Sequence, residues 1–184
     1  MILKNEQKYR SWVEVDLDNF SGNLQEIRRL IGDGADFMQT VKADAYGHGA
    51  IEISHAALRS GARMLGVANA DEGIQLRVSG IESPIVILGP STLSEIPDMI
   101  KYHLTPSVSD AGFALALEEQ LVRAYRTLSV HVEVDTGMGR GGTMHSEAVD
   151  LIQYIKTLPH ITLEGLFSHF ASREMMTPAA CVLA

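Results

Sequence analysis

Two spacings of apolar residues alternate along the chain, one typical of a strand and one typical of a helix. Residues 12–17, WVEVDL, alternate apolar and polar side chains, which predicts a half-buried strand. Apolar residues then recur every three or four positions up to Ile31, which predicts a helix capped by Asp18 and ended by Gly32. This order, a strand followed by a helix, recurs through the rest of the chain.

Six further segments predict strands that begin near residues 37, 64, 85, 104, 128 and 161. Segments with helical spacing lie between them, at 50–61, 71–80, 93–102, 110–121 and 145–158. Strands that alternate with helices across short loops predict parallel βα units. We therefore expect a (β/α)8 barrel of the TIM type. It would be incomplete, with about six of its eight units, because the 184 residues fall short of the roughly 250 that such a barrel takes.

An open, doubly wound sheet is the structural alternative, because parallel strands in this number also fit that architecture. Its first strand would lead into a phosphate-binding loop with the glycine spacing GxGxxG. The corresponding residues here, 42–49, read KADAYGHG and lack that spacing. The barrel is therefore the preferred prediction.

Charge and composition narrow the classes of function. The net charge of −8 argues against a surface for nucleic acid or for an anionic membrane. No apolar run is long enough to cross a bilayer, and residues 1–10 lack the apolar core of a signal peptide, so we expect a cytoplasmic protein. Cys181 is the single cysteine and excludes an internal disulfide. No Cys/His cluster has the spacing of metal ligands, so we expect no metal site.

Lys42 follows the strand that begins near residue 37. A lysine that closes a strand is usually a solvated surface residue. This one lies where the carboxyl ends of barrel strands form active sites, and it precedes a glycine-punctuated turn into a helix. The N–H groups at the start of a helix suit an anion. An amine beside an anion site is what pyridoxal 5′-phosphate (PLP), an aldehyde with a phosphate group, requires.

Residues 41–50, VKADAYGHGA, resemble the cofactor-attachment signature of the alanine racemases, which are PLP-dependent enzymes of fold type III. The motif is long and specific. The resemblance implies that Lys42 holds PLP as a Schiff base and moves a proton at the substrate α-carbon. It also implies that Tyr46 donates a hydrogen bond to the cofactor phosphate. The implied reaction is the interconversion of L- and D-alanine, the D-isomer serving cell-wall synthesis.

Residues 132–140, VEVDTGMGR, resemble a second motif of this family. By themselves they indicate a strand that ends in a glycine-rich turn with a solvated arginine. The resemblance places Arg140 near the phenolic oxygen of PLP and the substrate carboxylate. Many members carry a carbamylated lysine where this chain has Glu133. Glu133 and Asp135 lie on the same strand face, and we hypothesise that the Glu133 carboxylate replaces the carbamate in holding Arg140.

Residues 163–171, LEGLFSHFA, resemble the family strand whose histidine packs against the PLP ring, and His169 is the matching residue. A single histidine on an apolar strand is more often a core residue. Its position at the carboxyl end of a strand, like that of Lys42, favours the functional interpretation.

The resemblance covers residues 10–172, which we expect to form a partial N-terminal barrel domain, and leaves 173–184 as an unmatched tail. Family members have two more barrel strands and a C-terminal β-domain, which supplies the second acid/base tyrosine across a homodimer interface. Neither Tyr125 nor Tyr154 is assigned that role. We therefore expect a truncated chain that retains PLP weakly, has little or no activity alone, and lacks a clear basis for dimerisation. A racemase of broader substrate range, a PLP-binding barrel protein that does not racemise, and an inert or complementing fragment remain alternatives.

Overall fold

Strands and helices alternate along the chain in the computed structural model, which describes residues 10–171. The strands are β1 (Met38–Thr40), β2 (Met64–Val67), β3 (Ile85–Ile87), β4 (Thr105–Val108), β5 (Leu128–Asp135), β6 (Thr143–Met144) and β7 (Ile161–Phe167). The helices are α1 (Leu17–Ile31), α2 (Lys42–Gly47), α3 (Ala50–Arg59), α4 (Ala70–Val78), the 3-10 turn η1 (Leu93–Glu95), α5 (Ile96–Tyr102), α6 (Ala111–Ala124) and α7 (Ala148–Ile155).

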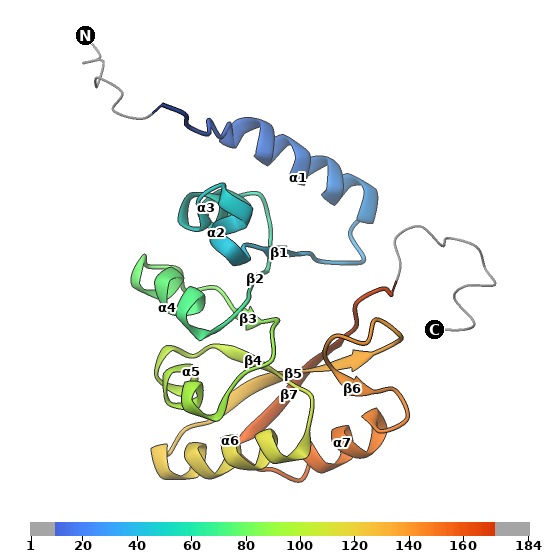
Figure 1. The fold of residues 1–184 in the computed structure, drawn as a ribbon. Helices are drawn as coiled ribbons and strands as arrows, with labels where there is room; N and C mark the ends of the chain where they lie inside the picture. Colours follow the sequence, from blue (N-terminus) through green and yellow to red (C-terminus); the bar gives the residue numbers. More distant parts are fainter. Residues whose placement is uncertain (1–9, 172–184) are drawn as a thin grey trace, which may run out of the picture.

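All strand pairs of the sheet are parallel. The order is β1-β2-β3-β4-β5, and β7 then pairs with β5. The short β6 pairs with the last two residues of β5. Each of the strands β1 to β5 is adjacent to the next one along the chain, and helices α3 to α6 follow one another along the outside of the sheet (Figure 1). This is the arrangement of a barrel and confirms the α/β, TIM-type prediction. Within residues 10–171, β1 and β7 each pair with one other strand, as does the two-residue β6.

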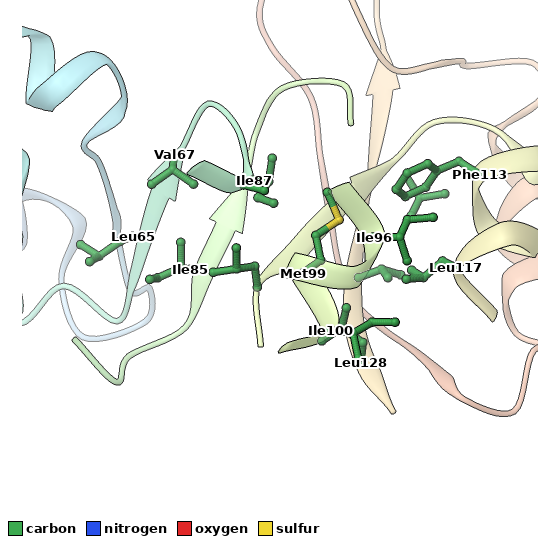
Figure 2. Close-up of a cluster of buried hydrophobic side chains, with 14 of the residues drawn as sticks. Leu65, Val67, Ile85, Ile87, Ile96, Met99, Ile100, Phe113, Leu117 and Leu128 are labelled. Carbon is green, nitrogen blue, oxygen red and sulfur yellow. The ribbon is translucent and has the colours of Figure 1, made fainter. Parts of the chain in front are cut away.

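The outer face of the sheet forms the main core with the helices. Leu65, Val67, Ile85 and Ile87 pack in one buried cluster with residues of α5 and α6 (Figure 2). Side chains alternate between the two faces of a strand, so their neighbours face the barrel interior. These interior positions include the small or polar residues Gly66, Thr105, Ser107 and Glu133, together with the apolar Val86. The outer face therefore contributes most of the hydrophobic stability, and the interior is available for chemistry.

The predicted strand at 12–17 is wrong. Residues 11–16 have no regular structure and are exposed, and the chain becomes helical at Leu17. The helix cap is Asp16, not Asp18, because the Asp16 carboxylate accepts hydrogen bonds from the N–H groups of Asp18 and Asn19 at 3.0 and 2.9 Å. An alternating pattern shows which side chains could be buried, but a strand also needs a neighbouring backbone, and this segment has none among the described residues.

Other boundaries differ by smaller amounts. The helix predicted at 93–102 is divided into η1 and α5, and Pro97 lies in the first turn of α5. The last strand, predicted to begin near residue 161, covers Ile161–Phe167, so His169 lies just beyond its end. The predicted tail 173–184, with Cys181, lies outside the described residues. No helix within residues 10–171 combines the length and the apolar character that crossing a membrane requires.

Candidate active site

The carboxyl ends of β1, β2, β3, β5 and β7 surround one cavity of about 300 Å³. This is the end of a barrel where active sites form. The cavity is lined by Lys42, Ala68, Leu88, Gly89, Pro90, Glu133, Arg140, Gly141, Phe167, Ser168 and His169. Four residues selected from the sequence therefore line the same cavity: Lys42, Glu133, Arg140 and His169. Up to 127 positions separate them in the chain. Within the described part of the chain, no cluster of His, Cys, Asp or Glu could hold a metal ion.

Lys42 begins a turn with an unusual backbone. Ala43, Asp44, Ala45 and Tyr46 all have φ between +51° and +56°, so α2 is one turn of left-handed helix. Each such residue costs about 1–2 kcal/mol relative to the right-handed form, because its Cβ approaches the carbonyl oxygen that follows. The sequence gives no hint of this turn, since none of the four residues is glycine. Contacts outside the turn must offset the strain.

The start of α3 is less open to an anion than the sequence suggests. The first N–H of the helix, that of Ala50, donates to the Asp44 carboxylate at 2.7 Å. The N–H of Gly49 donates to the Asp44 carbonyl at 3.0 Å. The expectation of free N–H groups at this helix end is therefore wrong for Ala50, whose N–H instead ties the left-handed turn to α3.

Glu133 is a buried carboxylate beside the cavity, with 8% of its surface exposed. Burial raises its pKa, while the positive charges of Arg140 and His169 act in the opposite direction. A Cβ at Gly141 would lie 3.2 Å from Glu133 Oε2, so the carboxylate lies against the glycine-rich loop. In the described residues Glu133 and Arg140 both line the cavity but form no direct hydrogen bond or ion pair with each other.

Arg140 reaches the cavity because the loop after β5 folds back over it. Backbone N–H groups of Gly139 and Gly137 donate to the Asp135 carboxylate and lower its pKa. β6 then pairs with β5 in parallel and closes the loop. Gly142 has φ +95°, and a Cβ there would lie 2.8 Å from the Asp135 nitrogen, so this position requires glycine.

His169 follows β7 and lines the same cavity with an exposed ring. Its Nδ1 lies 2.9 Å from the carbonyl oxygen of Phe170. The hydroxyls of Thr136 and Ser168 are 2.6 Å apart and join the loops that carry Arg140 and His169. Sequence reasoning missed this bridge because nothing local marks a contact between residues 32 positions apart.

Tyr46 lies away from these residues. Its side chain is 61% exposed and lines a separate hollow of about 400 Å³ beside α1, together with Asp16, Asn19 and Gln39. The structure therefore brings together Lys42, Glu133, Arg140 and His169 but does not bring Tyr46 into their cavity.

Sequence reasoning also missed Glu72, whose carboxylate contacts the turn after Lys42. The available signal was Asn69 followed three positions later by Glu72, a pattern that predicts a helix cap. Asn69 does cap α4, since its side chain accepts a hydrogen bond from the Glu72 N–H at 3.0 Å. The pattern contains nothing about the partners of the Glu72 side chain itself.

Comparison with known proteins agrees with this architecture. The family model described as "Alanine racemase, N-terminal domain" matches residues 15–180, so it includes part of the segment predicted as an unmatched tail. The alanine racemase of Carboxydothermus hydrogenoformans is 41% identical over 163 residues, which are 89% of this chain and 44% of that protein. The alanine racemase of Nostoc sp. is 38% identical over 172 residues, 92% of this chain and 45% of that protein.

Solved structures give the same result. The alanine racemase of Bacillus anthracis superimposes with a TM-score of 0.83 at 32% identity, over 91% of this chain and 44% of that one. That of Clostridium difficile 630 superimposes with a TM-score of 0.78 at 35% identity, over 84% and 42%. The chain spans less than half the length of the relatives that it matches. It belongs to the alanine racemase family, PLP-dependent isomerases, and corresponds to their N-terminal barrel domain.

Proposed function

We propose that this chain provides the lysine-bearing part of an alanine racemase site, which interconverts L- and D-alanine with PLP as cofactor. The observation that carries the proposal is the single cavity that Lys42, Arg140 and His169 line at the carboxyl ends of the strands. An amine, a guanidinium and an imidazole around one cavity fit the aldehyde and ring end of PLP. Tyr46, the expected phosphate ligand, lines the separate hollow beside α1, so its role requires a cofactor that reaches both spaces.

Each residue has a distinct proposed task. PLP, when bound, withdraws electrons from the substrate α-carbon and makes its proton labile. Lys42 would hold the cofactor, and its Nζ, as an amine at the cavity, would be the group that removes or returns a proton at the substrate α-carbon. The Arg140 guanidinium presents a fixed fork of donors to the anionic oxygens of cofactor or substrate. The His169 ring, which lines the same cavity, would help to hold the cofactor ring.

Glu133 is proposed to orient Arg140. Its carboxylate is buried in β5, and the Arg140 charge acts on it without direct contact. The attraction between the two charges would draw Arg140 toward the cavity, and the lack of a direct hydrogen bond between the two side chains leaves its guanidinium donors free for an anion. A side chain held in a close ion pair would have fewer donors to offer.

The activity of the isolated chain is a separate proposal. Racemisation needs proton removal on one face of the α-carbon and delivery on the other, and the described residues place one amine at the cavity. We therefore propose weak PLP retention and little or no racemisation by this chain alone, a cytoplasmic location, and a homodimer as the form in which the family site is complete.

The substrate amino acid is open to a second candidate. A histidine racemase from Leuconostoc mesenteroides superimposes with a TM-score of 0.78 at 28% identity over 85% of this chain. The same barrel portion therefore occurs in a racemase named for another amino acid. A racemase of broader range is the alternative to one specific for alanine.

Two lysine variants test the cofactor assignment. Added PLP should give the visible absorbance of lysine-bound cofactor in the unsubstituted chain and in Lys156→Arg, an exposed lysine at the end of α7. The absorbance should be absent from Lys42→Arg. Equal absorbance in all three proteins would overturn the assignment of Lys42.

A further inference from the structure

The carboxylate of Glu72 connects the ends of two strands at the candidate site. Its Oε1 accepts a hydrogen bond from the Ala43 N–H at 2.9 Å, and its Oε2 accepts one from the Ala68 N–H at 2.8 Å. Ala43 is the residue directly after Lys42, and Ala68 directly follows β2. Lys42 and Ala68 both line the site cavity. One side chain in the first turn of α4 therefore holds the backbone at Ala68, which lines the cavity, and at Ala43, directly after Lys42.

The turn after Lys42 needs such a contact because its backbone is strained. Four successive residues, 43–46, are left-handed and none is glycine. Most of the other bonds are local: the Ala45 N–H donates to the Val41 carbonyl at 2.8 Å, and His48 Nδ1 lies 2.8 Å from the Ala45 carbonyl oxygen. Among residues 10–171, Glu72 is the one side chain from another βα unit that hydrogen-bonds this turn.

We propose that Glu72 is a positioning residue for Lys42. Its two hydrogen bonds hold the left-handed turn against β2, and this fixes the direction in which the Lys42 side chain enters the cavity. The proposal rests on the proposed function of Lys42 as the cofactor lysine. Both carboxylate oxygens are required, because each accepts a different N–H. Glutamine keeps the shape of the side chain but offers an N–H₂ group where one of the acceptors was.

Glu95 supplies a matched control one βα unit further along the chain. Its Oε1 accepts from the Ala70 N–H at 3.3 Å, and its Oε2 accepts from the Thr92 N–H at 2.7 Å. Like Glu72, Glu95 accepts from two backbone N–H groups, and it also accepts from the Thr92 hydroxyl at 2.9 Å; neither Ala70 nor Thr92 is next to Lys42 in the chain. Glu95→Gln should loosen the fold near η1 without affecting the turn after Lys42.

Hydrogen exchange of the full chain without cofactor tests the hold on the turn. In Glu72→Gln the amides of residues 42–49 should exchange about tenfold faster, the change expected when a hydrogen bond to a charged group is lost. In Glu95→Gln these amides should exchange as in the unsubstituted chain. Unchanged exchange at 42–49 in Glu72→Gln would overturn the proposal.

Trapping of PLP on Lys42 with borohydride gives the second readout. The rate of labelling at Lys42 should fall in Glu72→Gln and stay unchanged in Glu95→Gln, and equal rates in both variants would overturn the link to Lys42. If the unsubstituted chain is not labelled at Lys42, the proposed function of that residue fails. The exchange experiment then decides the inference about the turn by itself.

A third variant covers the case in which Glu72→Gln does not fold. Glu72→Asp keeps the charge, but its side chain is shorter by one methylene group, so its carboxylate cannot reach both amides. Exchange should then increase at Ala43, at Ala68 or at both. Full protection at both positions would contradict the two-point contact.

Discussion

The buried carboxylate of Glu133 gives the site a pH dependence that can be measured on the isolated chain. Burial raises its pKa above the ordinary 4.5. The folded state therefore holds the proton to a higher pH than the unfolded state does. The stability from this group is present below pH 4.5 and is lost as the pH rises through the folded pKa. Glu133→Gln should remove this loss. The variant's free energy of unfolding, relative to that of the unsubstituted chain, should therefore be higher at neutral pH than in acid.

Asp135, two positions away on the same strand, provides a control of opposite sign. The backbone N–H groups of Gly139 and Gly137 lower its pKa below the ordinary 3.8. Its contribution is present above that pH and is lost as the pH falls. Asp135→Asn should therefore destabilise the chain at neutral pH. Urea unfolding at several pH values measures both variants, and a shift of the same sign for both would contradict these assignments.

His131 is a second titratable residue, half-buried, which faces the barrel interior on β5. Burial lowers its pKa below 6.5, and Glu164, whose Oε2 lies 3.7 Å from Nε2, opposes the shift. As the pH falls below 6.5 the unfolded state takes up the proton first, so stability should decline. His131→Phe should reduce this decline. Unfolding curves from about pH 5 to about pH 8 would test it, and an unchanged pH dependence would rule out His131 as its source.

The backbone of β7 accommodates the His131 side chain of β5. The register between β5 and β7 shifts at Val130 and His131, and Gly165 then lies opposite the histidine. A Cβ at Gly165 would be 2.8 Å from His131 Cε1. Gly165→Ala should therefore destabilise the chain by about 1–3 kcal/mol, the usual cost of overpacking.

The His131→Ala background and a second glycine give the controls for this prediction. Removing the imidazole should relieve the effect of Gly165→Ala, because the clash is with the ring. Gly34→Ala, where a new Cβ meets nothing within 4 Å, should be close to neutral. A cost for Gly165→Ala that persists without the His131 ring would place its cause elsewhere in β7.

The elements differ in how well the sequence predicts them. The strand predicted to begin near residue 128 does begin at Leu128, because its apolar and β-branched residues face a packed core. The strand at 12–17 failed because alternation does not supply a pairing partner. Two elements left no local signal: β6 depends on a loop that folds back onto β5, and the left-handed turn of α2 depends on Glu72, from the next βα unit.

The site was predictable to a similar extent. Lys42, Arg140 and His169 share a cavity because each lies at or after the carboxyl end of a parallel strand, and this rule can be applied to sequence alone. The rule does not apply to Tyr46, whose position depends on the handedness of the turn before it. Its exposed side chain beside α1 could not be inferred from the motif.

At the scale of the whole molecule, the parallel sheet has its edges at β1 and β7 within the described residues. Such edges leave backbone hydrogen-bonding groups unpaired and favour association. Exposed apolar side chains, including Leu166 on β7 and Phe170 beyond it, add to this surface. The purified chain should therefore tend to associate. It should also show little racemisation of D-alanine, because the described residues place one amine at the cavity. A coupled assay together with light scattering measures both, and sustained turnover by a monodisperse monomer would contradict this expectation.

The identity of the lysine that PLP modifies tests the central claim most directly. The unsubstituted chain is incubated with PLP, reduced with borohydride and digested, and the labelled peptide is identified by mass spectrometry. The account predicts one dominant label, on Lys42 within residues 41–50. A dominant label on another lysine, or no label at saturating PLP, would contradict it.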